Sequence, residues 1–141
     1  MENLTFLFFI AVLNFSVAQT EQPNEIVVHN VSDKESFIQM LIENDNFVDT
    51  EKYGVVTTAL RNSKTKPNWS HQYHYRIVFK EDSIVIKPYW TMNITIDLGV
   101  AEAESQLEKW KYSTRKNING FIHQETIEML TNAGYTDISY N

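Results

Sequence analysis

The stretch "HQYHYRIVFKEDSIVIKPYW", residues 71–90, carries the pattern that decides the fold. Apolar side chains take the odd positions from Tyr73 to Phe79 and the even positions from Ile84 to Trp90. Two runs with this period, joined by a short polar stretch, predict an antiparallel hairpin. A turn centred on residues 81–82 produces these apolar pairs: Tyr73 with Trp90, Tyr75 with Pro88, Ile77 with Ile86 and Phe79 with Ile84. Sliding one strand by a single residue would oppose apolar and polar side chains, so the pattern itself selects this register.

The other face of the hairpin is mostly polar. The same register sets His74 opposite Tyr89 and Arg76 opposite Lys87. Two cations that face each other across strands repel, so we expect a carboxylate or solvent beside them. The candidate carboxylates are those of Glu51 and Asp97. The sharper hypothesis is that His74, Arg76, Lys87 and Tyr89 form a face that receives an anionic ligand or partner.

Pro88 predicts an irregularity of the sheet. Proline cannot donate a hydrogen bond to a sheet. In the predicted register Pro88 lies in a non-hydrogen-bonded pair with Tyr75, so that pairing loses nothing. The missing N–H would point toward a third strand, and we therefore expect an edge, bulge or bend of the sheet beside Pro88.

The histidine spacing argues against a metal site in this hairpin. His71 and His74 are three residues apart, which places them on opposite faces of a strand. His29, and His123 with Glu125 close to it in sequence, are single candidates, and a lone histidine is more often a hydrogen-bonded residue than a ligand. The chain has no cysteine, which excludes disulfides and thiolate ligands. We expect no metal and no cofactor.

The segments before the hairpin predict an α+β domain. Residues 26–30, "IVVHN", predict a short strand. Ser32 and Glu35 have the spacing of a capping box, with Ser32 as N-cap. The apolar positions after them predict an amphipathic helix: Phe37, Ile38, Met40, Leu41 and Ile42. Residues 52–62, "KYGVVTTALRN", are rich in β-branched residues and predict one strand, with residues 63–70 as a loop.

The C-terminal part predicts two helices and a last strand. Four apolar positions at helical spacing predict a helix over residues 100–113: Val100, Ala103, Leu107 and Trp110. The basic run "KWKYSTRK", residues 109–116, then forms its last turn, where cations complement the helix dipole. Residues 120–134 predict a second helix, with Gly134 suited to the left-handed position just beyond its end. Residues 135–140 predict a short last strand.

The first residues predict export. "MENLTFLFFIAVLNFSVA" holds an apolar run too short to span a bilayer and ends in a small-x-small cleavage pattern. We assign residues 1–18 to a signal peptide, residues 19–25 to a polar lead and residues 26–141 to one domain without a membrane span. An uncleaved anchor is the alternative, because Glu2 stands where Lys or Arg is usual.

Composition limits the compartment and the partners. Cleavage would remove Glu2 and change the net charge from −6 to −5. Such an acidic chain lacks the basic footprint of a nucleic-acid binder. A small exported domain without disulfides fits a bacterial envelope, so we expect a periplasmic or secreted protein in which the sequons at Asn30, Asn68 and Asn93 carry no glycan.

Three stretches carry a resemblance to a known family. They are "VVHNVSDKESFIQML" (27–41), "KYGVVTT" (52–58) and "HYRIVFKEDSIVI" (74–86). Together they resemble an exported bacterial family of unknown function with a TBP-like fold. The resemblance implies a β-α-β4-α order and no catalytic residues. A second C-terminal helix and a last strand depart from that order, so a ferredoxin-like fold is the alternative.

These observations predict an α+β domain with one antiparallel sheet and helices on one face. The sequence has no glycine-rich phosphate loop, no G-x-S-x-G and no H-E-x-x-H. We therefore expect a binding module of the cell envelope that uses the open sheet face, with Trp69 at its edge. One alternative is a small hydrolase or isomerase that uses His74 with a carboxylate. Another is a structural envelope component.

Overall fold

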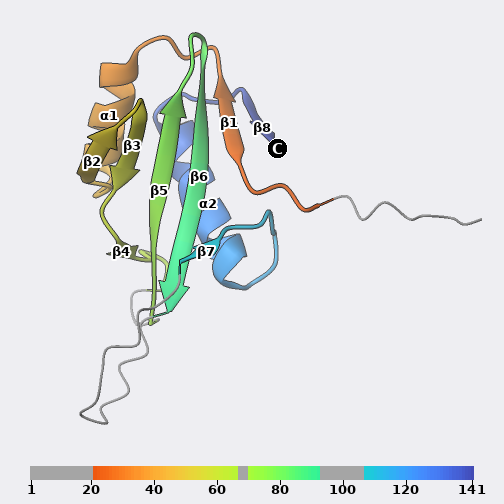
Figure 1. Cartoon of the computed structure of the whole chain (residues 1–141). Helices are drawn as coiled ribbons and strands as arrows, with labels where there is room; N and C mark the ends of the chain where they lie inside the picture. Colours follow the sequence, from red (N-terminus) through yellow and green to blue (C-terminus); the bar gives the residue numbers. More distant parts are fainter. Residues whose placement is uncertain (1–20, 67–69, 93–106) are drawn as a thin grey trace, which may run out of the picture.

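The long hairpin of β5 (His71–Phe79) and β6 (Ser83–Met92) is the centre of the structure (Figure 1). The computed structural model describes residues 21–66, 70–92 and 107–141, so residues 1–18, Trp69 and Asp97 lie outside it. The two strands pair antiparallel from His71 with Met92 to Phe79 with Ile84. The predicted register of residues 71–90 is confirmed, pair by pair.

Shorter strands extend the hairpin into one antiparallel sheet. They are β1 (Ile26–His29), β2 (Val48–Lys52), β3 (Val55–Thr58), β4 (Arg61–Asn62), β7 (Glu108–Lys109) and β8 (Ile138–Tyr140). The strand order is β2-β3-β5-β6-β1-β8, with β4 also beside β5 and β7 also beside β6. The predicted first and last strands are confirmed as β1 and β8.

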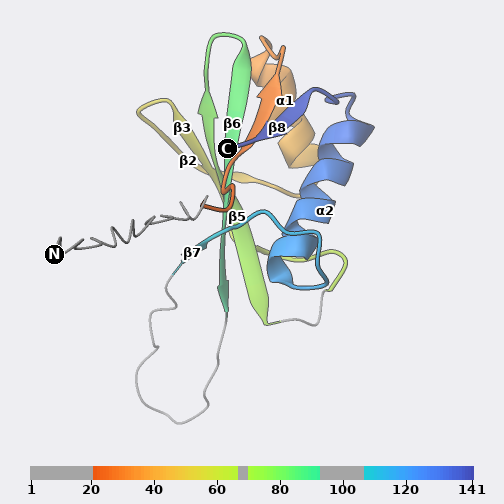
Figure 2. The same ribbon diagram turned by 90° about the vertical axis from the view of Figure 1, so that its right-hand side faces the viewer.

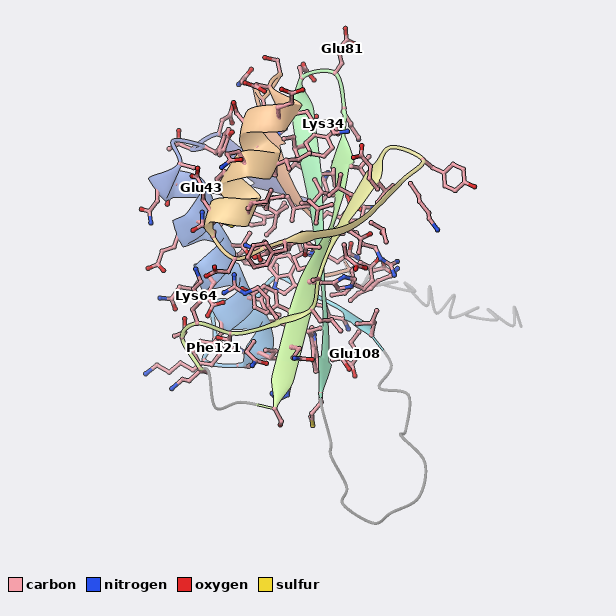
Figure 3. All side chains as sticks on the ribbon, turned by 90° about the vertical axis from the view of Figure 1, so that its left-hand side faces the viewer. Lys34, Glu43, Lys64, Glu81, Glu108 and Phe121 are labelled. Carbon is pink, nitrogen blue, oxygen red and sulfur yellow. The ribbon has the colours of Figure 1, made fainter. Side chains whose placement is uncertain are left out.

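Two helices, α1 (Lys34–Glu43) and α2 (Ile118–Asn132), lie on the same side of this sheet (Figure 2). Phe37 of α1 meets Phe79 edge-on, and the Tyr75 hydroxyl of β5 lies 2.7 Å from the Thr126 hydroxyl of α2. Side chains fill the space between helices and sheet (Figure 3). The protein is therefore an α+β protein with one open antiparallel sheet whose helices cover one face. None of the described helices is long and apolar enough to cross a membrane.

The core lies between the helices and the sheet. It is built from the predicted apolar positions of the hairpin and of α1, together with residues of α2 and Trp110. Its largest fully buried side chains include Trp110, Tyr73, Tyr75, Phe37 and Leu41. Ile42, predicted for the same apolar face of α1, is exposed.

The start of α1 differs from the predicted capping box. Asp33, not Ser32, is the N-cap residue: its backbone is extended and its carboxylate accepts the N–H of Ser36 at 3.0 Å. The Ser36 hydroxyl also donates to Asp33, at 2.5 Å. The helix thus begins one residue later than predicted, because a carboxylate caps the free N–H groups and also complements their partial positive charge.

The predicted single strand over residues 52–62 is wrong. Tyr53 and Gly54 have φ values of 52° and 75°, the left-handed conformation that tight hairpin turns require. The chain therefore reverses there, and β2 and β3 form a hairpin in which Lys52 faces Val55. Gly54 was the signal in the sequence, since glycine adopts this conformation without steric cost.

The predicted helix over residues 100–113 is wrong where it can be compared. Residues 93–106 lie outside the described ranges, but 107–113 are not helical. Lys109 pairs with Tyr89 and Glu108 with Trp90, as strand β7. The basic run of residues 109–116 is consequently a strand and loop before α2, not the end of a helix.

The pairing of β6 on its other side is interrupted beside Pro88, where an edge, bulge or bend was predicted. β1 pairs with Ser83–Ile86 of β6, whereas β7 pairs with Tyr89 and Trp90. Pro88 lies between the two pairings, and its carbonyl accepts the N–H of Trp110 at 3.0 Å. The sheet therefore exchanges one partner strand for another beside Pro88.

The end of α2 agrees with the prediction. The helix ends at Asn132, and Gly134 follows with φ of 91°. The N–H of Tyr135 then returns to the Leu130 carbonyl at 2.9 Å, which satisfies one of the free carbonyls of the last turn.

Candidate functional site

The face of the sheet opposite the helices is the candidate site, and we call it the open face. Residues paired across strands lie side by side on the same face. Three rows therefore cross it: His74, Tyr89 and Lys109; Thr57, Arg76 and Lys87; and Val55, Val78, Val85 and Val27. The four residues predicted for a binding face, His74, Arg76, Lys87 and Tyr89, do lie together.

Arg76 and Lys87 are neighbours in the sheet, but each cation has another partner. The Lys87 ammonium lies 2.5 Å from the Glu25 carboxylate, just before β1. The Arg76 guanidinium lies over the Tyr89 ring, 4.5 Å from its centroid. Both contacts offset the repulsion that two paired cations experience.

The acid beside Lys87 is not one of the two expected from the sequence. Glu51 instead pairs with Lys34 of α1, on the helix side. Asp97 lies outside the described residues. Glu25 reaches Lys87 because β1 pairs with β6, a long-range contact that local pattern does not encode.

His74 belongs to the open face but is buried, with 6% of its surface exposed. Its Nδ1 lies 3.2 Å from the Thr58 carbonyl, and its ring packs against Tyr89 at 5.8 Å between centroids. Burial lowers the pKa of His74, and Arg76 adds to this, whereas the Thr58 hydrogen bond and Asp49 oppose it. Among the described residues no group bonds its Nε2. His74 therefore presents no charge to a partner at neutral pH.

The charge of the open face differs in sign from that of the whole chain. Four cations belong to its rows or extend them: Lys52, Arg76, Lys87 and Lys109. Among the described residues, the carboxylates shown to act on these cations or on His74 are those of Glu25 and Asp49. The chain as a whole has 18 acidic and 12 basic residues. In the part of this face that the structure describes, four cations thus stand against two carboxylates.

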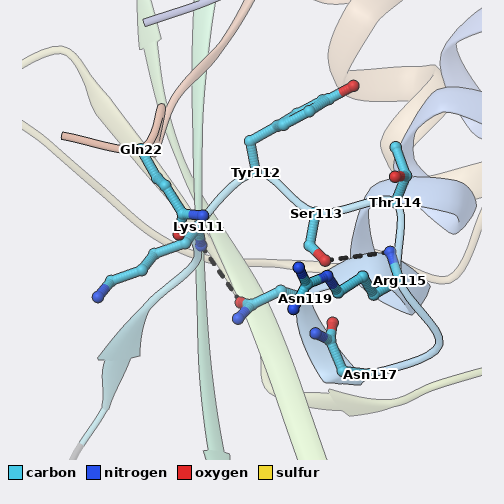
Figure 4. A pocket seen from close by; sticks show the side chains of 8 residues that line it. All are labelled: Gln22, Lys111, Tyr112, Ser113, Thr114, Arg115, Asn117 and Asn119. Carbon is cyan, nitrogen blue, oxygen red and sulfur yellow. Dashed lines mark hydrogen bonds between the residues drawn. The ribbon is translucent and has the colours of Figure 1, made fainter. Parts of the chain in front are cut away.

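A pocket of about 350 Å³ lies where the chain runs from β7 into α2 (Figure 4). Lys111 and Arg115 supply its cations. Three polar side chains accept hydrogen bonds from backbone N–H groups: Ser113 from Arg115 (3.1 Å), Asn117 from Gly120 (2.9 Å) and Asn119 from Lys111 (3.2 Å). Their hydroxyl and amide hydrogens remain as donors, so the pocket favours negative charge. The sequence prediction missed it because residues 107–113 were expected to be helical.

The other histidine candidates have hydrogen-bonding roles. His29 Nε2 lies 2.7 Å from the Ser139 hydroxyl, which links β1 to β8. His123 Nε2 lies 2.8 Å from the Tyr140 hydroxyl, and its ring stacks on Trp110. Burial lowers the pKa of His123. Among the described residues, no three His, Asp or Glu side chains are grouped as metal ligands would be.

Comparisons with known proteins assign neither a family nor a function to the chain. No family model matches the chain, and neither a curated protein nor a solved structure is significantly similar to it.

Proposed function

We propose that the protein is an exported binding module that receives an acidic partner on its open face. The observation that carries this proposal is that Lys52, Arg76, Lys87 and Lys109 of an acidic chain lie on the one sheet face that neither described helix covers. Opposite charge raises the rate of encounter and selects among partners. The open face therefore favours an acidic protein or polyanion over a neutral one.

The row of valines gives the same face an apolar component. Val85 and Val27 are 3% and 6% exposed, while Val55 and Val78 are partly exposed. Only Val55 and Val78 therefore offer apolar surface to a partner, next to the row of Arg76 and Lys87. Interfaces commonly combine an apolar centre with a charged rim, and this arrangement supports a macromolecular partner.

The enzyme hypothesis has less support. The hydrolase or isomerase hypothesis requires a carboxylate within hydrogen-bond reach of His74 and access of a substrate to its ring. Among the described residues the hydrogen bond of His74 is to the Thr58 carbonyl and not to a carboxylate, and only 6% of the residue is exposed. A structural envelope role would require self-association through an exposed apolar patch, and the exposed Arg76 on the open face disfavours it.

We propose the TBP-like fold as the finer description. Strands and helices follow the order β1-α1-β2-β3-β5-β6-α2, which supports a β-α-β4-α pattern with β4 and β7 as short additions. β8 is an extra strand beside β1. The ferredoxin-like alternative would treat β2 and β3 as an inserted hairpin between α1 and β5.

The binding proposal is tested with a defined polyanion. Poly-L-glutamate is titrated into the purified protein by calorimetry, at low and at moderate salt. We expect saturable binding that weakens with salt, because screening shortens the range of charge attraction. The double variant Arg76→Gln with Lys87→Gln should bind at least about tenfold more weakly.

The matched control removes two cations from elsewhere. Lys66, which lies over the Phe121 ring of α2, and Lys116, just before α2, are exposed and lie outside the open face. Lys66→Gln with Lys116→Gln has the same net charge as the test variant. Equal losses in the two double variants would show that binding depends on net charge alone and would contradict the proposal.

Export is tested separately, by whether the chain recovered from the envelope fraction begins at Gln19.

A further inference from the structure

A second cavity, of about 130 Å³, lies on the helix side of the sheet. It is bounded by β4, the loop that follows β4, β5 and α2, and we call it the Arg61–Glu125 cavity. This volume accommodates several waters or one small organic molecule. The sheet separates the cavity from the open face, so it can be tested independently of the proposed function.

Arg61 supplies a fixed positive charge to this cavity. Its Nη1 donates to the Asn44 carbonyl at 2.6 Å and lies 3.3 Å from Asn46 Oδ1. Its guanidinium also lies over the Tyr73 ring, 5.4 Å from the centroid. A guanidinium keeps its charge at any working pH. Among the described residues no carboxylate forms an ion pair with Arg61.

Glu125 supplies a fixed negative charge. One carboxylate oxygen accepts the Ser63 hydroxyl at 2.6 Å and the Thr65 N–H at 2.7 Å, and the other accepts the Tyr73 hydroxyl at 2.7 Å. Burial alone would raise the pKa of Glu125, but these hydrogen bonds outweigh it and lower the pKa. The carboxylate is therefore ionised at neutral pH.

Glu128 adds a second carboxylate to the same wall. It lies three residues after Glu125 on α2, so both side chains are on one side of the helix. Glu128 is exposed, and none of the hydrogen bonds or ion pairs of the described residues involves its carboxylate. Lys64, also in the wall, pairs with Asp45 at 3.1 Å. The cavity thus has a cationic side at Arg61 and an anionic side on α2.

These charges line one cavity without pairing with each other. A simple anion would be attracted to Arg61 and repelled by Glu125 and Glu128, and a simple cation would experience the reverse. A molecule with both charges satisfies both sides. We propose that the Arg61–Glu125 cavity binds a small zwitterion, a free α-amino acid with its carboxylate at Arg61 and its ammonium at Glu125 and Glu128.

The cavity is preorganised for such a ligand. Hydrogen bonds to other groups hold Arg61 and Glu125 in place, so binding would not have to order either side chain. The volume limits the ligand to small side chains, and glycine and alanine are the probes that the cavity fits best.

The proposal is tested by NMR titration of the purified protein with glycine, alanine, acetate and methylammonium. Glycine and alanine should cause saturable shifts of the Thr65 and Met129 amide signals. Their affinity should exceed that of acetate and of methylammonium by at least about tenfold, because each of these carries only one of the two charges. Absence of saturable shifts with both amino acids, or equal affinity for acetate, would overturn the proposal.

Substitutions of the charged residues test whether the amino acid binds in the Arg61–Glu125 cavity. Glu128→Gln changes an exposed residue, so the protein stays folded, and we expect about fivefold weaker amino-acid binding. Glu81→Gln, at the tip of the β5–β6 hairpin (Figure 3), is the control and should leave binding unchanged.

Arg61→Gln should abolish amino-acid binding, and if that variant does not fold, Glu128→Gln decides alone. Unchanged affinity in Glu128→Gln would overturn the assignment. Arg76→Gln with Lys87→Gln, on the open face, should not affect amino-acid binding.

Discussion

The guanidinium of Arg76 lies 4.5 Å from the centroid of the Tyr89 ring, although the residue paired with Arg76 in the sheet is Lys87. Tyr89 is the next residue but one along β6 on the same face. Arg76 thus leans along the sheet, away from the like charge and over an aromatic ring. This contact keeps an exposed cation in place on the open face.

We predict that Arg76 and Tyr89 are energetically coupled. A double-mutant cycle of Arg76→Ala and Tyr89→Leu, followed by urea unfolding, should give a coupling of about 0.5–1 kcal/mol in favour of the contact. The parallel cycle of Lys87→Ala with Tyr89→Leu should give a smaller value, because Lys87 is paired with Glu25. Equal coupling in the two cycles would show that the ring contact contributes nothing specific.

Glu125 should be a strong contributor to stability. Glu125→Ala leaves the buried Tyr73 and Ser63 hydroxyls without their acceptor, and we expect a loss of about 2–4 kcal/mol in the free energy of unfolding. Glu128→Ala, on the same helix but exposed, is the control and should cost less than about 0.5 kcal/mol.

The same carboxylate predicts a loss of stability in acid. The pKa of Glu125 is lowered in the folded state, so its contribution is complete above the ordinary pKa of about 4.3 and disappears as pH falls through the folded value. Unfolding curves of the wild type and of Glu125→Gln should therefore converge as pH falls below about 4. Parallel curves would contradict the ionised state of Glu125.

His74 predicts a second dependence on pH in a higher range. Burial lowers its pKa in the folded state, so below about 6.5 the unfolded chain binds more protons at this residue. Stability should fall as pH drops from about 7 toward 5, and His74→Gln should make this slope shallower. His123, whose pKa is also lowered, is present in both proteins, so the difference between their profiles reports His74. Identical slopes would refute the prediction.

Two glycines should differ sharply in their tolerance of alanine. A Cβ at Gly120 would lie 1.8 Å from the Arg115 carbonyl oxygen, a backbone atom, so Gly120→Ala forces the chain before α2 to move. We expect a cost of about 3 kcal/mol or more. Gly54 has open space around it and only its φ of 75° opposes a side chain, so Gly54→Ala should cost about 1 kcal/mol. Urea unfolding of both variants checks the order, and a reversed order would contradict the close approach at Gly120.

Some local patterns in the sequence were ambiguous. Ser32 was predicted as the N-cap of α1, but the adjacent Asp33 takes that role, and the apolar periodicity of the helix does not distinguish the two. Trp110 has helical spacing with Leu107, yet in the structure it is buried next to a strand that pairs with β6. In both places the outcome depended on a hydrogen bond to a specific group and not on the apolar pattern.

The candidate site likewise contains residues that the sequence could place and residues that it could not. His74, Arg76, Lys87 and Tyr89 could be placed on one face from alternation alone, because strand side chains alternate strictly. Glu25 and Lys109 could not be placed on this face from the sequence, because each reaches it through the pairing of a distant strand with β6. The burial of His74 was also not predictable, because it depends on how Tyr89 and β3 pack around it.

Local features of the sequence specify the β5–β6 register, an irregularity beside Pro88 and the end of α2 near Gly134, because alternation, a missing N–H and a left-handed residue act locally. Tertiary packing places β1 between β6 and β8, joins residues 108–109 to β6, and brings Arg61 and Glu125 to one cavity. Those outcomes depend on contacts between segments far apart in the chain. Such contacts are selected by the packing of the whole core, and no local period of side chains specifies them.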